Sequence, residues 1–193
     1  MAKDTFYNLN EEKQDRIFKV LRDEFESKPF NEVTVKSIVE KLSIARGSFY
    51  QYFDDLEEAY FDVLYRETTD IHTLFIALFQ ESSYNLTSTL DSYGKQVAEI
   101  IFDPNIYRLY KNKYLAWTRD MEVSWRSYRA YADRAYYQAL AKDLKAEDME
   151  KIHFIKAVVH SLVIRTFQNA WSKEKFLEIY EKNTKWIIEG VDF

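Results

Sequence analysis

One segment of the chain, residues 33–53, concentrates the side chains best suited to bind a ligand through hydrogen bonds. Arginine and lysine can donate to the edge of a guanine, and glutamine can pair with the edge of an adenine. Threonine, serine and tyrosine hydroxyls can donate to phosphate oxygens and so fix the register on a nucleic-acid backbone. The segment supplies both kinds of group: Lys36, Arg46 and Gln51 for base edges, and Thr34, Ser48 and Tyr50 for phosphates.

Two short helices joined by a tight turn are predicted to position these side chains. Thr34 is a good N-cap, and Val33 before it can pack on Ile38 as a hydrophobic staple. The turn is expected at residues 43–44 and the second helix at residues 45–52. This is the layout of a helix-turn-helix, in which the second helix offers its side chains to a DNA major groove.

The second helix is expected to point Phe49 and Phe53 into a core and to present its remaining side chains outward. Gly47 has no side chain, so the start of this helix can approach a phosphate closely. There the free N–H groups and the helix dipole favour an anion. The residues expected to face outward are Arg46, Gly47, Ser48, Tyr50, Gln51 and Tyr52.

The composition favours an all-α fold. Only three Gly and two Pro occur in 193 residues, which indicates long helices with few turns. No segment alternates with a period of two, as a half-buried strand would. We expect a three-helix helix-turn-helix domain in residues 1–60 and a larger helical domain in residues 61–193.

Cap residues and apolar spacing give the expected helix boundaries. The first helix begins at Asn8 or Asn10 and ends before Pro29. Asp55 and Glu58 form a capping box that opens a fourth helix, expected to run on to about Gln80. The later helices are expected at residues 87–102, from Pro104 onward, as two helices within 107–137, and at 147–171 and 173–189.

The sequence gives no sign of catalysis. There is no nucleophile–base pair, no glycine-rich phosphate loop and no Cys. His153 and His160 lie two helical turns apart, too far to share one metal ion without other ligands. We therefore expect no enzyme, no catalytic residue, no cofactor and no metal site.

The N-terminus and the apolar runs predict a cytoplasmic protein with no membrane partner. The first residues lack the apolar core of a signal peptide. The longest apolar run, Leu74–Phe79, is far too short to cross a bilayer.

The charge balance restricts how such a chain could bind DNA. The formal net charge is -5, and residues 1–50 hold nine Lys and Arg against nine Asp and Glu. This argues against nonspecific coating of nucleic acid, but it allows a site-specific reader with a few local cations. The alternative is a helical adaptor that binds protein without reading DNA. The salt dependence of DNA affinity would separate the two.

The remaining two-thirds of the chain suggests a ligand pocket. Aromatic residues and arginines crowd residues 107–137, and apolar cavities between helices commonly hold ligands. The alternative is an aromatic core with arginines on a solvated face. The candidate lining residues are Phe75, Phe79, Tyr110, Tyr114, Trp117 and Trp125. The arginines that could pair with an anionic or flat ligand are Arg108, Arg119, Arg126, Arg129 and Arg134.

The last two helices suggest a homodimer. Residues 147–191 carry more apolar surface than one helical layer needs, so two copies would form a four-helix bundle. A two-fold dimer presents the second helix of each helix-turn-helix, its recognition helix, to successive major grooves of DNA. This implies a palindromic binding site, or operator. The alternative is a monomer that buries these faces internally.

Residues 17–60 resemble the N-terminal domain of the TetR family of bacterial transcriptional regulators. The resemblance runs through residues 33–39 (Val-Thr-Val-Lys-Ser-Ile-Val), 44–53 (Ile-Ala-Arg-Gly-Ser-Phe-Tyr-Gln-Tyr-Phe) and 53–59 (Phe-Asp-Asp-Leu-Glu-Glu-Ala). It implies an all-helical homodimer with a C-terminal ligand-binding and dimerisation domain. It further implies a repressor that leaves its double-stranded DNA operator when a small-molecule effector binds. The positions matching the family's DNA contacts are Thr34, Lys36, Arg46, Gly47, Ser48, Tyr50, Gln51 and Tyr52.

The sequence departs from the family pattern at four positions. Ala45 stands where a capping Ser or Thr is frequent, at a cost of about 1 kcal/mol of capping. Ser43 replaces a turn glycine, and Pro29 replaces a glycine after the first helix. Leu56 replaces a frequent phosphate-binding lysine, so we expect no phosphate contact there.

Overall fold

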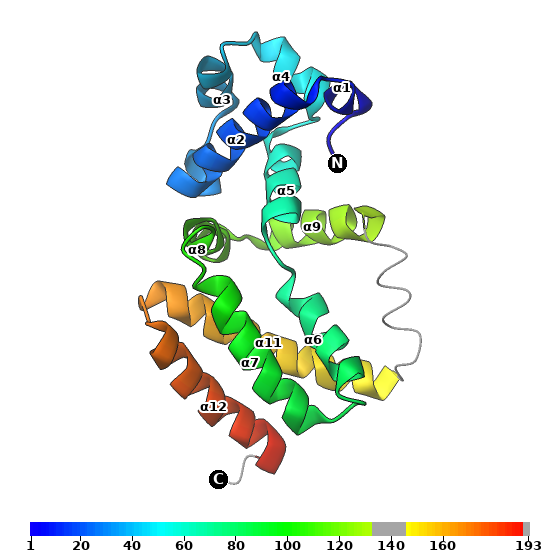
Figure 1. Ribbon diagram of the computed structural model, residues 1–193, viewed down its shortest axis with the longest axis vertical. Helices are drawn as coiled ribbons and strands as arrows, with labels where there is room; N and C mark the ends of the chain where they lie inside the picture. The colour runs from blue at the N-terminus through cyan, green and yellow to red at the C-terminus, as the bar shows by residue number, and fades with distance from the viewer. Residues whose placement is uncertain (133–145, 191–193) are drawn as a thin grey trace. The chain divides into compact units, whose positions relative to one another are not determined.

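The computed structural model describes residues 1–132 and 146–190, and every regular element within them is a helix (Figure 1). The expected all-α fold is therefore confirmed. The described residues pack as two compact units: residues 1–68 with 105–132, and residues 69–104 with 146–190. A functional division near residue 60 stays a prediction. Arg134, one of the arginines considered for a ligand, lies outside the described residues.

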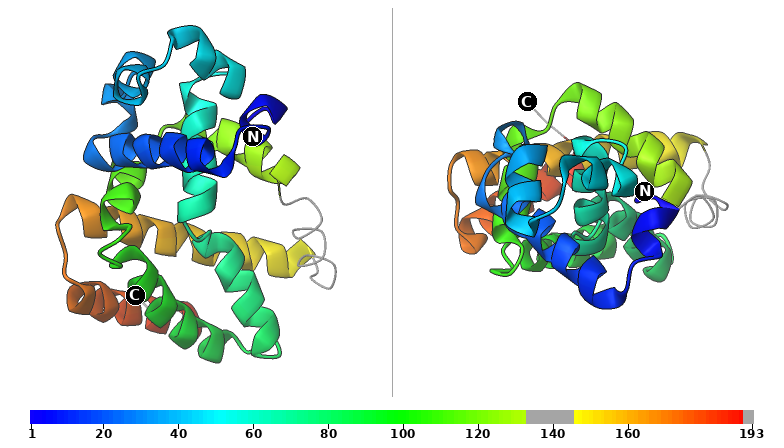
Figure 2. Two further views of the ribbon diagram at one scale, coloured as in Figure 1. Left: turned by 45° about the horizontal axis from the view of Figure 1, so that its top comes forward. Right: turned by 90° about the horizontal axis from the view of Figure 1, so that it is seen from above.

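The first unit contains the N-terminal helices together with two helices from the middle of the chain. Phe25, Phe49, Phe53 and Tyr60 are fully buried in its core. Its elements are α1 (Asp4–Tyr7), α2 (Glu11–Ser27), a 3-10 turn (Phe30–Glu32), α3 (Val35–Leu42), α4 (Arg46–Tyr52), α5 (Leu56–Glu67), α8 (Tyr107–Ala116) and α9 (Arg119–Ala132). Figures 1 and 2 show α3 and α4 joined by a short turn, and α2 packs against α3.

Helix α8 closes the C-terminal end of α2. The Asn112 side-chain amide donates to the Phe25 carbonyl at 2.9 Å and to the Glu26 carbonyl at 3.1 Å. Arg22 of α2 donates in turn to the Asn105 carbonyl at 2.9 Å. The last carbonyls of a helix have no partner within it, so α8 supplies partners that α2 needs.

Three of the predicted N-caps are confirmed. The Asn10 side chain accepts from the Lys13 N–H, so α2 begins after Asn10 and not after Asn8. The Thr34 hydroxyl accepts from the Ser37 N–H at 3.1 Å, and the Asp55 carboxylate accepts from the Glu58 N–H at 2.7 Å. These caps fix where α2, α3 and α5 begin.

The second unit contains α6 (Ile71–Glu81), α7 (Leu86–Ile101), α11 (Ala146–Gln168) and α12 (Lys173–Glu189). Helix α7 packs against both α6 and α12, and α12 packs against α11. Gly94 of α7 allows the Tyr180 ring of α12 to lie close to the α7 backbone. A Cβ atom there would lie 2.2 Å from Cε1 of Tyr180, whose hydroxyl donates to the Leu90 carbonyl at 2.7 Å.

The prediction of one long helix from Asp55 to Gln80 is wrong. Helix α5 ends at Glu67, and Thr68 is extended at φ -112° and ψ 137°. The Thr68 hydroxyl donates to the Leu64 carbonyl at 2.6 Å, and the Asp70 carboxylate accepts from the Thr73 hydroxyl at 2.8 Å. The Thr68 hydroxyl thus satisfies a carbonyl at the end of α5, and the Asp70–Thr73 bond joins two side chains at the start of α6.

Two further boundaries differ from the sequence-based prediction. Pro104 does not begin a helix, because α8 starts at Tyr107. The N-terminal helix α1 was not expected; it places Phe6 in the core with no exposed surface.

Candidate DNA-binding surface

A buried carboxylate fixes α3 against α2. Glu24 of α2 is 1% exposed and pairs with the ammonium groups of Lys41 at 2.6 Å and Lys28 at 2.8 Å. It also accepts from the Ser37 hydroxyl at 2.8 Å. Burial would raise the pKa of Glu24, but these three donors outweigh it and lower that pKa to about 2. The carboxylate is therefore charged and braces the start and end of α3.

The turn between α3 and α4 is built without glycine. Ser43 adopts the left-handed conformation at φ 55° and ψ 44°. Its N–H donates to the Glu40 carbonyl at 3.2 Å, and the Ile44 N–H donates to the Val39 carbonyl at 3.1 Å. These two bonds close the C-terminal end of α3 in the manner of a Schellman motif. Ser43 therefore performs the role of the glycine that it replaces.

Helices α3 and α4 together present a polar surface that we call the α3–α4 surface. It comprises Thr34, Lys36, Arg46, Gly47, Ser48, Tyr50 and Gln51, of which Ser48 is half-buried and the others are exposed. A Cβ atom at Gly47 would meet no atom within 4 Å, so folding does not require a glycine there.

The two cationic side chains of this surface, Lys36 and Arg46, have different contacts. The Lys36 side chain is 80% exposed and lies 3.8 Å from a Glu40 carboxylate oxygen. Arg46 donates to the Tyr50 hydroxyl at 3.3 Å, and its guanidinium lies 5.9 Å from the centre of that ring. Tyr50 therefore holds Arg46 on the outer face of α4.

The start of α4 has no side-chain cap. Ala45 occupies the N-cap position and makes no side-chain hydrogen bond to the helix. The expected loss of the cap at Ala45 is therefore confirmed. The N–H groups of the first turn are thus not engaged by a capping side chain.

The prediction that Tyr52 faces outward is wrong. Tyr52 is 6% exposed and belongs to the core of the first unit. Its ring lies 6.2 Å from the Phe6 ring and 5.9 Å from the Lys13 ammonium. Tyr52 follows Phe49 by three residues and so shares its helix face, which α1 covers.

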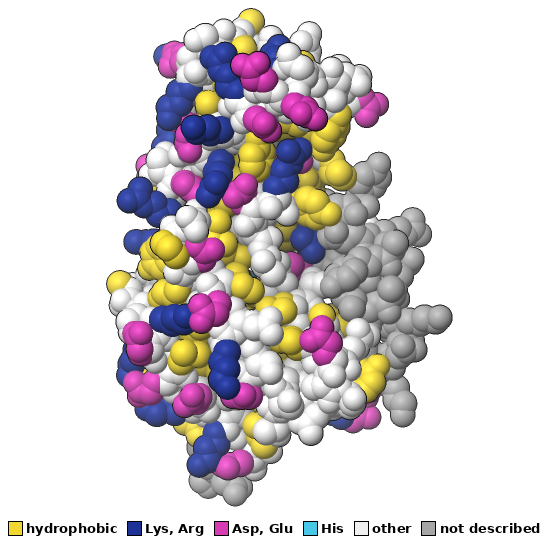
Figure 3. All heavy atoms as spheres, viewed as in Figure 1, with side chains coloured by type: hydrophobic (Ala, Val, Ile, Leu, Met, Phe, Trp, Pro, Cys, Tyr) yellow, Lys and Arg dark blue, Asp and Glu magenta, His cyan; other side chains and the backbone are white. Residues whose placement is uncertain are grey.

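Acidic and basic side chains are mixed on the face of the molecule that Figure 3 shows. In Figure 3, Lys and Arg side chains are interspersed with Asp and Glu side chains on the face shown. This agrees with the balanced charge of residues 1–50. Any attraction to DNA would therefore have to come from a local arrangement of cations and not from a strongly basic net charge.

The six residues predicted to line a ligand pocket fall into two sets. Phe75 and Phe79 belong to α6 in the second unit, where their rings stack at 6.0 Å. The others, Tyr110, Tyr114, Trp117 and Trp125, belong to α8, α9 and the residues between them in the first unit. The structure does not place all six around one described cavity.

The aromatic set of the first unit surrounds a lysine. The Lys113 ammonium lies 5.5 Å from the Trp117 ring, 5.3 Å from the Trp125 ring and 5.8 Å from the Tyr114 ring. The Trp117 indole donates to Glu122 at 2.8 Å. The two tryptophan rings also pack on Phe61 of α5, so Trp117 and Trp125 lie against the core around the N-terminal helices.

The arginines near these rings have several roles. Arg126 pairs with Glu122 at 2.8 Å, and Arg129 lies over the Trp125 ring at 5.6 Å. Arg108 and Arg119 are exposed. The described arginines therefore form no single cluster that faces a cavity.

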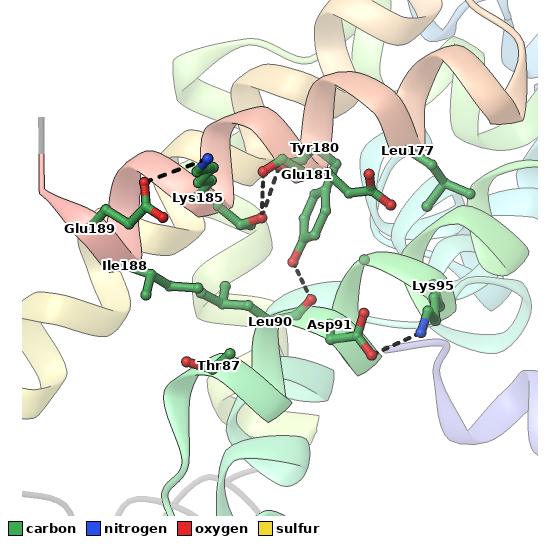
Figure 4. A pocket seen from close by; sticks show the side chains of 12 residues that line it. Thr87, Leu90, Asp91, Lys95, Leu177, Tyr180, Glu181, Lys185, Ile188 and Glu189 are labelled. Carbon is green, nitrogen blue, oxygen red and sulfur yellow. Dashed lines mark hydrogen bonds and ion pairs between the residues drawn. The ribbon is translucent and has the colours of Figure 1, made fainter.

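A groove of about 360 Å³ lies between α7 and α12 in the second unit (Figure 4). Its lining includes Leu90, Gly94 and Tyr180 and the ion pairs Asp91–Lys95 and Lys185–Glu189. None of the six predicted lining residues contributes to it. Sequence reasoning missed this groove because its two walls lie about 90 residues apart in the chain, as the Tyr180–Leu90 bond illustrates.

Two further searches cover only the residues that the structure describes. Within residues 1–132 and 146–190, no helix is both long and apolar enough to span a membrane. Over the same ranges, no group of three or more His, Asp or Glu residues is arranged to hold a metal ion.

Comparison with known proteins identifies two regions of the chain. Residues 17–58 match the family model described as bacterial regulatory proteins, tetR family. Residues 86–190, more than half of the chain, match the model described as tetracyclin repressor, C-terminal domain. A comparison with curated proteins gave no match.

Two solved structures match most of the chain. One is a TetR family transcriptional regulator from Chloroflexus aurantiacus J-10-FL, 23% identical, with 97% of this chain and 91% of that chain covered and a TM-score of 0.49. The other is a mutant of the HlyIIR protein, 14% identical, with 89% and 96% covered and a TM-score of 0.46. From the two family matches we conclude that the chain belongs to the TetR family of DNA-binding transcription regulators, whose members are not enzymes.

Proposed function

We propose that this regulator is a dimeric repressor that a small molecule releases from a palindromic operator. The α3–α4 surface is the observation that supports the proposal most strongly. It gathers exposed hydrogen-bond donors on two short helices that Glu24 and a buried aromatic core hold in place. Operator binding would place the protein in the bacterial cytoplasm.

The proposed contacts divide into two kinds. Thr34, Ser48 and Tyr50 bind phosphates through their hydroxyls, and Gly47 allows the backbone to approach the sugar–phosphate strand. Base edges are read by Lys36, Arg46 and Gln51. Tyr52, buried in the core, is not part of this set. In the free protein the Tyr50 hydroxyl accepts from Arg46, so its own hydrogen can be donated to a phosphate.

Selection of bound sequences from a random DNA pool tests the proposal. With the selected operator in hand, Lys36→Ala should weaken binding about tenfold and relax the preference at one base pair. Lys95→Ala is the matched control, because both lysines are exposed and pair with a carboxylate one helical turn away. Equal operator affinity of the Lys36→Ala variant and the parent would show that the assignment of contacts is wrong.

The salt dependence of binding separates a DNA reader from a protein-binding adaptor. Each phosphate contact releases counterions, so operator affinity should fall steeply as the salt concentration rises. Selection that yields no preferred sequence, together with no salt-dependent binding, would favour the adaptor instead.

We further propose that two copies associate through α11 and α12. Phe154 of α11 is 59% exposed and Trp186 of α12 is 54% exposed, unusually high for large apolar side chains. Between Phe154 and Arg165 the exposed face of α11 carries the small residues Ala157 and Ser161, which permit close helix packing. A two-fold axis at this face would pair two recognition helices with a palindrome.

The effector is proposed to contact aromatic side chains, either Tyr110, Tyr114, Trp117 and Trp125 or Phe75 and Phe79. It would release DNA by binding the operator-free conformation more tightly than the bound one. Tryptophan fluorescence of the full chain, titrated with a library of aromatic compounds, finds candidates. A compound that binds but leaves operator affinity unchanged is not an effector.

A further inference from the structure

The N-terminal segment packs on the C-terminal end of α4, and three of its polar groups meet consecutive carbonyls there. The Lys3 ammonium donates to the Tyr50 carbonyl at 2.9 Å. The Thr5 hydroxyl donates to the Gln51 carbonyl. The Lys3 N–H donates to the Tyr52 carbonyl at 2.9 Å. One segment thus supplies all three partners.

These carbonyls would otherwise lack partners. The last four carbonyls of any α-helix have no N–H donor within the helix. In α4 the Phe53 N–H donates to the Phe49 carbonyl at 3.0 Å. The carbonyls of residues 50–52 then have no donor within the helix. Phe53 is extended at φ -134°, so no left-handed residue folds the chain back to close this end.

Apolar contacts hold the segment in place. Phe6 has no exposed surface, and its ring lies 5.5 Å from the Phe53 ring and 6.2 Å from the Tyr52 ring. The Lys3 ammonium also pairs with the Asp54 carboxylate at 2.7 Å, just beyond α4. The positive charge suits the negative end of the helix dipole.

We propose that Lys3, Thr5 and Phe6 form a cap, here called the N-terminal cap, that orders the last turn of α4 for DNA recognition. Tyr50 and Gln51 belong to the α3–α4 surface, and their own carbonyls are the ones that the cap binds. Lys3 and Thr5 are thus positioning residues that need not touch DNA. This inference rests on the proposed function, since it assumes that α4 reads the operator.

The central test compares Thr5→Val with Thr5→Ser in the full chain. Valine keeps the shape of threonine but removes the hydroxyl, and serine restores the hydroxyl. In the DNA-free protein, Thr5→Val should speed hydrogen exchange of the α4 amides about threefold to tenfold, the effect of one lost hydrogen bond. Exchange in α2 and α5 should stay at the parent rate, which shows that the variant is folded. Thr87→Val, at an exposed threonine of α7, is the matched control.

Operator binding supplies the second readout. Thr5→Val should weaken binding by a similar factor while leaving the slope of log affinity against log salt unchanged, because no phosphate contact is lost. Thr5→Ser should restore both affinity and exchange. For Lys3→Met the affinity should also fall; a slope reduced by about one contact would show that Lys3 binds a phosphate itself and would overturn its positioning role.

The outcomes separate the two proposals. Unchanged α4 exchange in Thr5→Val overturns the N-terminal cap, and faster exchange with parental operator affinity overturns its role in recognition. If the parent selects no DNA sequence, the proposed function fails. Hydrogen exchange of the α4 amides in Thr5→Val then tests the N-terminal cap without DNA.

Discussion

Replacing Gly47 with alanine should stabilise the protein and weaken its binding to DNA. Gly47 lies in the first turn of α4, and a Cβ atom there would meet nothing within 4 Å. Alanine is favoured over glycine in a helix by about 1 kcal/mol, so the free energy of unfolding should rise by up to that amount. A natural chain that carries glycine there forgoes this stability.

In the complex, the same methyl group would occupy the space between the α4 backbone and the DNA strand. If a phosphate lies against this turn, the methyl group lengthens or breaks a charge-assisted hydrogen bond. Such a loss costs about 1–3 kcal/mol, or about fivefold to a hundredfold in Kd. Stability and affinity should therefore change in opposite directions.

Urea unfolding and fluorescence anisotropy on the selected operator measure the two quantities. Gly94→Ala is the control, because its Cβ would lie 2.2 Å from the Tyr180 ring and should cost about 1–3 kcal/mol of stability. Parental operator affinity in Gly47→Ala would refute the close approach of α4 to the DNA strand. A loss of stability in that variant would refute the reasoning about the free protein.

Two other predictions concern the brace of α3 and the dimer. Folding lowers the pKa of Glu24 from 4.5 to about 2. The charged carboxylate therefore stabilises the fold fully above about pH 4.5, and this stabilisation is lost as the pH falls toward 2. Glu24→Gln should therefore cost about 3 kcal/mol near pH 6 and about half of that near pH 3, measured by urea unfolding at both pH values; a pH-independent difference would contradict this origin. Phe154→Glu should shift the dimer to monomer in sedimentation, because it places charges at the proposed interface. Val123→Glu, at an equally exposed apolar residue of α9, is the control and should leave the dimer intact. If both variants sediment alike, the result would count against an α11–α12 interface.

The sequence predicts those features of the fold that depend on neighbouring residues. Thr34 and Asp55 were expected as caps because their side chains need only reach an N–H three residues away, and both do. The turn after Leu42 was also expected, although Ser43 stands in a left-handed position that glycine would occupy at lower cost. Local chemistry therefore gives the helix-turn-helix.

The features that the sequence did not predict depend on distant contacts or weak local signals. Helix α1 has four residues, too few for a periodic pattern, and is held by Tyr52 and Phe53 almost 50 positions away. The inward position of Tyr52 could have been found, because it lies three residues after Phe49. The break after Glu67 also had a signal in Thr68, Thr69 and Asp70, which favour helix ends over helix interiors.

The DNA-binding residues themselves stay a prediction, and the ligand site was harder still. An aromatic residue at helical spacing can fill a core or line a cavity, and spacing alone does not distinguish the two. Trp117 and Trp125 pack on Phe61 in the first unit, whereas Phe75 packs on Phe79 and Tyr93 in the second. Which residues share a unit depends on contacts between helices that are distant in sequence.

The discontinuity of the first unit has a consequence for protein engineering. A fragment that stops at residue 68 would lose Asn112, which closes α2, and would uncover the face of Phe61 on which Trp117 packs. The helix-turn-helix therefore cannot be separated by one cut after residue 68 and fused to the ligand-binding domain of another protein. A working chimera would have to carry residues 105–132 along with the first 68.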